Sequence, residues 1–176
     1  MKEIVINNKQ LLDSDIEQEV IRVKALIVNS SGKILLAHNN NTYQFPGGHK
    51  ESDEGREEAL IREVKEETGI SIVGDIEPFM NITTYDDNYF QTGKRVKNSI
   101  YYYRIVTDEV PNLQETHYDE LELETEFKLF YLPVSELQSF LEKKIEEKEM
   151  DEAIGVEMLF VVEEYKNIFG GIEWKY

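Results

Sequence analysis

The sequence predicts an α/β or α+β sandwich, in which a sheet packs between separate helices. Three observations predict this class: short alternating apolar runs that indicate several strands, two or three stretches rich in helix formers, and a hydrophobic content of 40%, enough to fill a core. The length of 176 residues suits one domain and is marginal for two. We therefore expect a single domain over residues 1–176, with a C-terminal helical extension at about residues 135–170.

The first candidate strands lie in the N-terminal third of the chain. A short apolar strip at Ile4–Ile6 precedes a longer run of alternating apolar residues at Val20–Val28. Residues 33–37 (KILLA) form the next run. The sequence SSG between these two runs favours a turn, so a hairpin is the simplest connection. A polar loop then leads into residues 43–48, with the sequence YQFPGG.

The remainder of the chain adds helices and further strands. Strong helix formers fill Glu54–Thr68 and end at Gly69, a residue type that frequently terminates helices. Apolar runs predict strands at residues 70–73, 82–85, 100–106 and 127–132. Pro133 ends the last run, and we expect two final helices, at residues 136–148 and 151–169.

The composition excludes several classes of protein and site. Nineteen Lys and Arg against 36 Asp and Glu leave a net charge of −17, which repels polynucleotides but still allows a small anion bridged by divalent cations. The absence of cysteine excludes disulfides, thiolate zinc sites and cysteine nucleophiles. No run approaches the ~20 apolar residues of a membrane span, and the N-terminal MKEIVINNKQ lacks a signal-peptide core. We therefore expect a soluble cytoplasmic protein.

The first predicted helix concentrates acidic groups. At about 100° per residue, Glu63, Glu66 and Glu67 share an arc of roughly 100°, while Leu60 and Val64 lie on a separate apolar face. Like charges this close repel one another by about a few tenths of a kcal/mol per pair. Mg²⁺ or Mn²⁺ would relieve this repulsion, because hard cations prefer oxygen ligands. The arc alone leaves two interpretations open, a metal site or the solvated face of a glutamate-rich chain.

These carboxylates belong to a longer pattern. The segment Gly48–Ile70 matches G-x5-E-x7-R-E-U-x-E-E-x-G-U, where U is apolar, at every defined position. The matching residues are Gly48, Glu54, Arg62, Glu63, Val64, Glu66, Glu67, Gly69 and Ile70. The segment resembles the signature of the Nudix hydrolases, and its length makes a chance match improbable. The lead-in FPGG at residues 45–48 and the stretch LPVSEL at residues 132–137 are weaker similarities.

The resemblance implies an αβα sandwich with a mixed central sheet, in which the signature forms a loop, a helix and a loop. It also implies Mg²⁺-dependent hydrolysis, with Mn²⁺ as a possible substitute, of a nucleoside diphosphate linked to another moiety or of a nucleoside triphosphate. The implied metal ligands are Glu63, Glu66, Glu67 and the backbone carbonyl of Gly47. Arg62 and Glu54 would form a pair that orients Glu63, which either binds metal or takes the proton from the attacking water.

Outside the signature, the residue roles stay open. Lys94, Arg95 and Lys97 are a cationic group in an acidic chain, and they either bind substrate phosphates or form a solvated hairpin tip. The family resemblance implies that one more carboxylate from a later loop completes the metal site, and spacing does not choose among Glu115, Glu120, Glu122, Glu124 and Glu126.

Two alternatives concern the protein as a whole. A non-catalytic module with the same fold would bind and sense a nucleotide without hydrolysing it. The wide apolar face of the last helix, which includes Leu159, Phe160 and Val162, either packs on the core or forms a homodimer interface. The expected partner is a small nucleoside-diphosphate compound, and the sequence does not identify which one.

Overall fold

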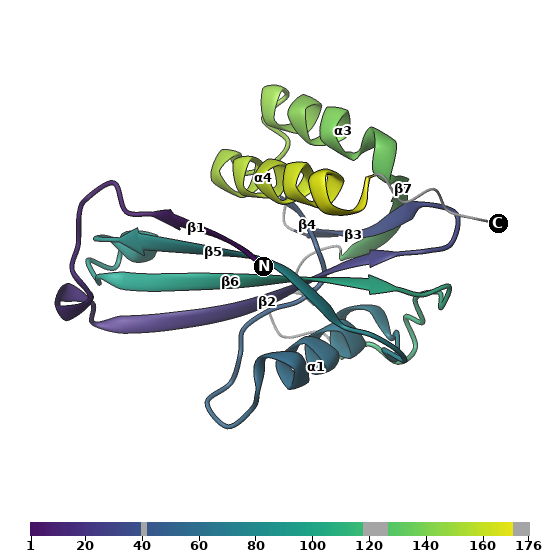
Figure 1. The fold of residues 1–176 in the computed structure, drawn as a ribbon, viewed down its shortest axis with the longest axis horizontal. Coiled ribbons are helices and arrows are strands. Elements are labelled where there is room, and N and C mark those ends of the chain that lie inside the picture. Colours follow the sequence, from purple (N-terminus) through teal and green to yellow (C-terminus); the bar gives the residue numbers. More distant parts are fainter. Residues whose placement is uncertain (40–41, 118–126, 171–176) are drawn as a thin grey trace.

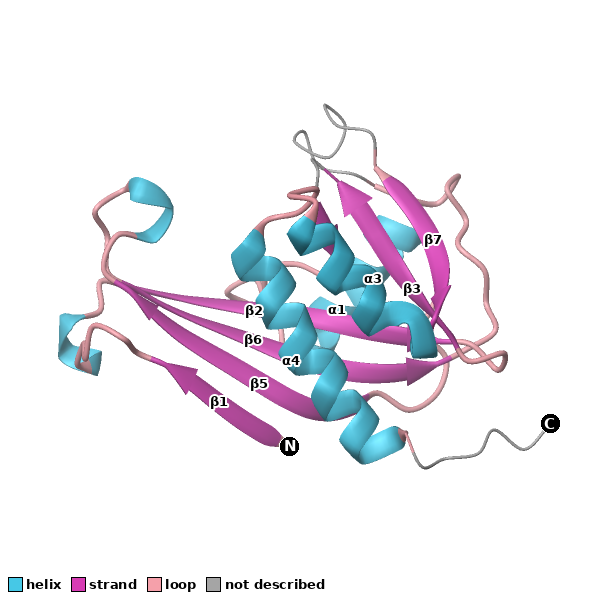
Figure 2. Ribbon diagram, turned by 90° about the horizontal axis from the view of Figure 1, so that it is seen from above, coloured by secondary structure: helices cyan, strands magenta, loops and turns pink. Residues whose placement is uncertain are grey.

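One mixed sheet runs through the middle of the structure, a computed structural model that describes residues 1–39, 42–117 and 127–170. In those residues, seven strands form the sheet in the order β1-β5-β6-β2-β3-β4, and β7 pairs with β3 (Figure 2). The strands are β1 (Lys2–Ile6), β2 (Gln18–Val28), β3 (Lys33–Asn39), β4 (Thr42–Gln44), β5 (Glu77–Asp86), β6 (Val96–Val106) and β7 (Lys128–Pro133).

The strands pair in both directions, as a mixed sheet requires. β2 is parallel to β6 and β1 is parallel to β5, whereas β5 is antiparallel to β6. β3 is antiparallel to β2, β4 and β7. The hairpin predicted between β2 and β3 is confirmed, because the amide of Asn29 donates to the carbonyl of Lys33 at 2.9 Å and Val28 pairs with Ile34.

Helices cover both faces of this sheet. Figure 1 shows α1 (Arg56–Thr68) on one face, and α3 (Val134–Glu146) and α4 (Glu152–Phe169) on the other. The predicted αβα sandwich with a mixed central sheet is therefore confirmed. The assignment of residues 1–176 to a single domain stays a prediction. In the part of the chain that the structure describes, no helix is both long enough and apolar enough to cross a membrane.

The alternation along β2 supplies two separate cores. Val23 and Ile27 belong to a buried cluster with Leu60 of α1. Leu26 and Val28, which lie between and beside them, belong to the larger cluster under α3 and α4. Successive side chains of a strand leave opposite faces of the sheet, so this one strand stabilises both helical layers.

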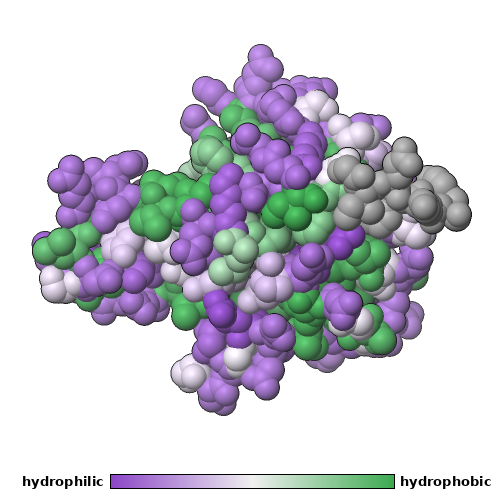
Figure 3. Space-filling view, viewed as in Figure 1, coloured by the Kyte–Doolittle hydropathy of each residue, from purple (hydrophilic) through white to green (hydrophobic). Residues whose placement is uncertain are grey.

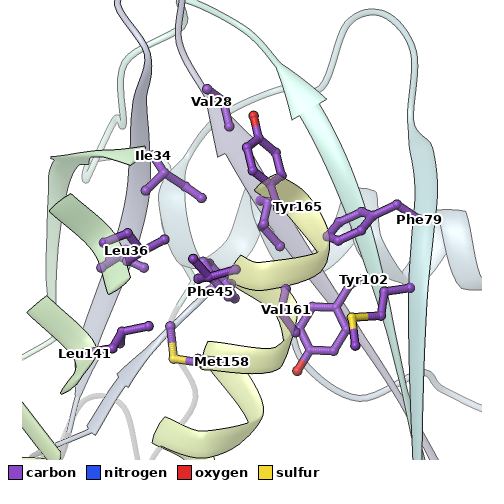
Figure 4. Close-up of a cluster of buried hydrophobic side chains, with 14 of the residues drawn as sticks. Val28, Ile34, Leu36, Phe45, Phe79, Tyr102, Leu141, Met158, Val161 and Tyr165 are labelled. Atoms are coloured by element: carbon purple, nitrogen blue, oxygen red, sulfur yellow. The ribbon is translucent and has the colours of Figure 1, made fainter. Parts of the chain in front are cut away.

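Figure 4 shows the larger of the two clusters. Phe45 lies near its centre, between Leu36 of β3 and two α4 residues, Met158 and Val161. Phe45 is fully buried and comes directly before the loop PGG, so the core fixes the start of that loop. Burial of such a ring contributes roughly 2–3 kcal/mol.

The apolar face of α4 is only partly covered. Val162 is buried and Leu159 packs against the core, as the core-packing interpretation expects. Phe160 remains 41% exposed and Val156 42% exposed. The homodimer interface stays a prediction.

One strand expectation is wrong, and several boundaries differ. Residues 70–73 form no strand. Ile70 is buried and Ile72 packs in the same cluster as α1, so these apolar residues cover the end of the helix instead of joining the sheet, while Val73 is 77% exposed. β5 and β6 begin at Glu77 and Val96, earlier than expected, since pairing with neighbouring strands extends them beyond their apolar cores.

Candidate active site

The signature helix is anchored through its apolar face. α1 begins after Gly55, whose amide donates to Oε2 of Glu58 at 2.6 Å, and ends at Gly69 in a left-handed conformation with φ of 72°. Leu60 and Val64 are fully buried against the sheet. Because this face is fixed against the sheet, Glu63, Glu66 and Glu67 on the neighbouring face of the helix are directed toward the loop that precedes it.

That loop is bonded along β2. The amide of Ala25 donates to the carbonyl of Pro46 at 2.8 Å, and the amide of Val23 donates to the carbonyl of Gly48 at 3.0 Å. Gly47 lies between these two bonds with φ of 128°, and a Cβ there would come within 2.2 Å of the carbonyl oxygen of Val23. Only glycine therefore fits this position, which agrees with the expected role of its free backbone conformation.

Glu63 packs against the loop at the neighbouring glycine. A Cβ on Gly48 would lie 2.4 Å from Oε2 of Glu63, so the space that a side chain would take is filled by this carboxylate. The side chain of Glu63 is 15% exposed. Burial raises the pKa of the Glu63 carboxyl, although the neighbouring Arg62 opposes the shift.

Arg62 binds three carboxylates at once. Its Nη2 lies 2.6 Å from Oε1 of Glu54 and its Nε lies 3.1 Å from Oε2, which makes a bidentate pair. Its Nη1 lies 3.0 Å from both Glu63 and Glu66. The guanidinium also donates to the carbonyl of His49 at 3.0 Å. Arg62 thus connects the loop, the start of α1 and two of the predicted metal ligands, while the roles assigned to Arg62 and Glu54 stay predictions.

Glu67 and Gly47 meet on the buried side of the same corner. The amide of Gly47 donates to Oε2 of Glu67 at 2.7 Å, and Glu67 is only 4% exposed. The carbonyl of Gly47 accepts a hydrogen bond from Nζ of Lys24, which also donates to Oε1 of Gln44 at 3.1 Å. The predicted metal-binding carbonyl is therefore paired with a cation from β2.

The donor chemistry at this corner fits a hard divalent cation. The candidate ligands are all oxygens, and two of the carboxylates, Glu63 and Glu67, are largely removed from water, which a positive charge must offset. Within the described residues, no three acidic or histidine side chains already converge on one point that could hold a metal ion. Arg62 and Lys24 supply the local positive charge instead.

A loop from later in the chain packs against the end of α1. The amide of Asn112 donates to the carbonyl of Thr68 and the amide of His117 to that of Glu66, both at 2.9 Å. Glu115 of this loop forms an ion pair with Lys65, and this ammonium lowers the pKa of the Glu115 carboxyl. The other predicted carboxylates, Glu120, Glu122, Glu124 and Glu126, lie outside the described residues.

A cavity of about 310 Å³ adjoins the corner on the α4 side of the sheet. Its walls come from β2, β4, β6, α4 and the turn at Tyr89–Gln91. The lining residues are Arg22, Lys24, Gln44, Phe45, Tyr89, Phe90, Asn98, Ile100, Tyr102, Asp151, Ala153, Ile154, Glu157 and Met158. Lys24 belongs to this wall and also contacts Gly47, so this one residue connects the cavity wall to the acidic corner.

Three polar residues of the cavity wall, Asn98, Tyr102 and Glu157, are partly or fully buried. Oδ1 of Asn98 is buried and, among the described residues, has no hydrogen-bond partner. Burial raises the pKa of Glu157, which accepts a hydrogen bond from the hydroxyl of Tyr102. A mostly apolar cavity of this size with a few converging polar groups is typical of a small-molecule site.

Comparison with known proteins decides the family. A family model described as NUDIX domain matches residues 19–154. The chain belongs to the NUDIX family. This match includes the whole of Gly48–Ile70 and most of the described sheet.

Individual NUDIX relatives match over shorter stretches. The chain is 41% identical over 58 residues to a CTP pyrophosphohydrolase of Escherichia coli strain K12, covering 30% of this chain and 43% of that protein. It is 50% identical over 48 residues to the putative 8-oxo-dGTP diphosphatase YtkD of Bacillus subtilis strain 168, covering 27% and 30%. The aligned stretches thus span less than half of these curated relatives.

A solved structure supports the fold of the NUDIX chain. An Ap4A hydrolase of C. elegans superposes with a TM-score of 0.52 at 18% sequence identity, covering 85% of this chain and 98% of that one. At this identity the similarity concerns the fold alone.

The predicted phosphate-binding cations of this NUDIX chain lie outside the lining of the cavity. Lys94 and Arg95 are exposed, and Lys97 pairs with Asp13 at 3.2 Å, and none of the three lines the cavity. Their predicted role in phosphate binding stays a prediction. Arg22 and Lys24 line the cavity instead.

Sequence analysis did not single out the charged residues of the cavity. A signal was present for two of them. Lys24 is the one charged residue in the run VKALIV at residues 23–28, and Glu157 interrupts the apolar spacing of α4 between Ile154 and Val161. A charged residue on an otherwise buried face indicates either a partner or a function.

Proposed function

We propose that the chain hydrolyses the diphosphate bond of a nucleoside diphosphate linked to another moiety, or of a nucleoside triphosphate, with Mg²⁺ or Mn²⁺. The observation that carries this proposal is a juxtaposition. Two carboxylates, the largely buried Glu63 and the buried Glu67, pack on the Gly47–Gly48 loop. Lys24 contacts this loop and also lines a cavity of about 310 Å³. NUDIX hydrolases generally use divalent metals, and the named relatives act on nucleotides, which supports the same conclusion.

The metal would be held by the oxygens of the acidic corner. Glu63, Glu66, Glu67 and the carbonyl of Gly47 are the proposed ligands, as the signature implies. A bound divalent cation supplies charge neutralisation for the phosphate oxygens and lowers the pKa of water. The burial of Glu67 and the contact of Glu63 with Gly48 hold these ligands against one loop.

Glu63 is also the best candidate for the proton acceptor. Its raised pKa makes it a stronger base than an exposed glutamate, and it stays within hydrogen-bond reach of Arg62 at 3.0 Å. Arg62 is itself fixed by the bidentate pair with Glu54, so it orients Glu63 from one side.

The reaction balances as a hydrolysis. The oxygen of water forms a bond to one phosphorus, the bridging bond from that phosphorus to oxygen breaks, and the proton from water passes to the base. The products are a nucleoside monophosphate and the phosphorylated second moiety, or pyrophosphate when the substrate is a triphosphate. The cavity beside the corner is the proposed subsite for the nucleoside, since it combines aromatic rings with Asn98.

A panel of diphosphate compounds tests this proposal. Sugar nucleotides, dinucleoside polyphosphates, ADP-ribose, nucleoside triphosphates and oxidised nucleotides are incubated with Mg²⁺, and phosphate is measured after coupling to a phosphatase. We expect turnover of at least one compound and a loss of about 100-fold or more in kcat for Glu63→Gln with the fold intact. Metal binding without hydrolysis of any compound would instead support the nucleotide-sensing alternative.

Three further expectations concern the binding partner, the cellular location and the oligomeric state. We expect a small nucleotide as the partner, because a net charge of −17 opposes a polynucleotide. A cytoplasmic location stays a prediction. So does a homodimer through α4, for which sedimentation of wild type against Phe160→Glu is the direct measurement.

A further inference from the structure

Lys24 occupies an unusual position for a lysine. It lies in the middle of β2, in a run whose other members are all apolar, and it is half-buried. Its ammonium donates to the carbonyl of Gly47 and to Oε1 of Gln44, and its stem lines the cavity. The side chain therefore extends from the cavity wall toward the acidic corner.

Lys24 is surrounded by groups of both charge signs. Glu67, Glu63 and Glu157 favour its charged form, while burial and the nearby Arg22 act against it, and the pKa of Lys24 is lowered on balance. The ammonium offsets negative charge at the corner but is poorly solvated there. Its contact with the carbonyl of Gly47 gives the cation a fixed place near Glu67.

We propose that Lys24 is an internal counter-ion that competes with the divalent cation for the carbonyl of Gly47, and so couples metal binding to the binding of an anionic substrate. This inference rests on the metal site of the proposed function. An ammonium and a divalent cation on the same carbonyl oxygen repel each other strongly in a partly buried site. Metal binding must therefore displace the ammonium.

The cavity offers the displaced ammonium a second partner. Lys24 already lines the cavity, so its side chain reaches this space without a change in the backbone of β2. A phosphate bound between the metal and the cavity would pair with the freed ammonium. The bound substrate then holds the Lys24 ammonium away from the carbonyl of Gly47, which strengthens metal binding. By thermodynamic reciprocity, bound metal also strengthens substrate binding.

The competition is measured as Mn²⁺ affinity, independently of turnover. Isothermal titration of Mn²⁺ is carried out on wild type, Lys24→Met and Lys24→Gln, each without and with inorganic phosphate as the anionic probe. We expect both variants to bind Mn²⁺ alone roughly 10-fold more tightly than wild type. We also expect phosphate to tighten Mn²⁺ binding several-fold in wild type and little in the variants.

Lys50→Met is the matched control. Lys50 lies in the same loop, and its ammonium bonds the carbonyl of Glu51 at 2.7 Å, not that of Gly47. Removing the Lys50 charge changes the net charge near the site but leaves the Lys24 ammonium in place. We therefore expect a much smaller change in Mn²⁺ affinity. Thermal unfolding of each variant checks that it remains folded at the temperature of the titration.

The outcomes separate the inference from the function on which it rests. Equal or weaker Mn²⁺ binding by both Lys24 variants, with wild-type binding intact, overturns the counter-ion role and leaves the metal site standing. An equal gain in Lys50→Met also overturns it, since the effect is then general. If wild type binds no Mn²⁺ at all, the metal site and the inference fail together.

Discussion

Glu63 lies directly against the backbone of Gly48, with no side chain between them. Gly48 has ordinary backbone angles, so its value at this position is the space it leaves and not its flexibility. At Gly47 the reverse holds, since φ of 128° and the nearby carbonyl of Val23 exclude any side chain. Two adjacent glycines of the signature thus serve different physical purposes.

We predict that Gly48→Ala displaces the Glu63 carboxylate while the protein stays folded. The new Cβ would lie 2.4 Å from Oε2, and the flexible side chain can move away. A displacement of this order lowers kcat/KM by roughly 100-fold. Gly55→Ala is the control, because its Cβ meets only the end of the Glu58 side chain, at 3.2 Å. Steady-state kinetics and circular dichroism of both variants check the prediction, and unchanged activity in Gly48→Ala would contradict it.

Asn98 is the second position where a single side chain is expected to matter. Its Oδ1 is buried in the cavity wall and, within the described part of the chain, makes no hydrogen bond. We predict that Asn98→Leu reduces the ratio of kcat/KM between the best and the worst nucleotide base by about 10-fold, the value of one polar contact. Ser99→Ala is the control, since Ser99 is not among the lining residues. Equal base selectivity in all three proteins would remove Asn98 from substrate recognition.

At the scale of elements, the loop and the helix of the signature depend on one ion pair. The bidentate contact between Arg62 and Glu54 holds the pKa of the Glu54 carboxyl below its ordinary value. Stabilisation by this pair is therefore complete above the ordinary pKa of about 4.3 and is lost as the pH falls through the lowered value in the folded protein.

We predict that Glu54→Gln lowers the free energy of unfolding by about 1 kcal/mol at pH 7, since solvent screens a half-buried pair. The difference from wild type should shrink as the pH falls below about 4.3, where the carboxyl of the unfolded protein becomes protonated, and it should disappear below the lowered pKa of the folded protein. Urea unfolding of both proteins at pH 7, 5, 4 and 3 measures this. A difference that stays constant down to pH 3 would mean that the pair is not its cause.

The other end of α1 is closed by contact with a distant loop. Gly69 has φ of 72°, and a Cβ there would lie 2.2 Å from the carbonyl oxygen of Asn112. Gly93 has nearly the same φ, 75°, but a Cβ on it would meet nothing within 4 Å. Alanine substitution at these two glycines therefore separates the free-energy cost of the backbone conformation from the cost of the clash with Asn112.

We predict that Gly69→Ala destabilises the protein by about 3 kcal/mol and Gly93→Ala by about 1 kcal/mol. The smaller value is the strain of an L-residue at positive φ, and the excess is the displacement of the loop at Asn112. Chemical denaturation of the two variants gives both numbers. Equal losses would show that the loop moves aside without cost.

For the molecule as a whole, the dominant feature is a net charge of −17. The face of the molecule in Figure 3 is largely hydrophilic, with several hydrophobic patches between the polar side chains. Charge repulsion of this size opposes the compact state, and cations that bind the folded form offset it.

We predict that 5 mM Mg²⁺ raises the melting temperature of wild type by several degrees more than Na⁺ at equal ionic strength, because specific binding adds to screening. Glu67→Gln removes a buried ligand candidate, and it should reduce the Mg²⁺ response to that of Na⁺. Differential scanning fluorimetry over a range of Mg²⁺ concentrations makes the comparison. A wild type that responds equally to both cations would count against the proposed metal site.

The same scale explains which parts of the fold could be predicted. The helix of the signature and the alternating run of β2 depend on neighbours a few residues apart, so the sequence predicts their bounds to within a few residues. Residues 70–73 have the composition of a strand, yet they form none, and Ile70 and Ile72 pack in the same cluster as α1. Strand formation requires a free sheet edge within reach, and only the whole fold decides whether one is available.

By itself, the sequence determined the acidic corner of this protein and the family to which it belongs. Arg62, Glu63, Glu66 and Glu67 lie within six positions of one helix, and local geometry is enough to bring them together. Only the tertiary structure decided the cavity and its cations. Lys24, Asn98 and Glu157 come from two strands and a helix far apart in the chain, and they meet because parallel pairing of β2 with β6 and the packing of α4 close over them.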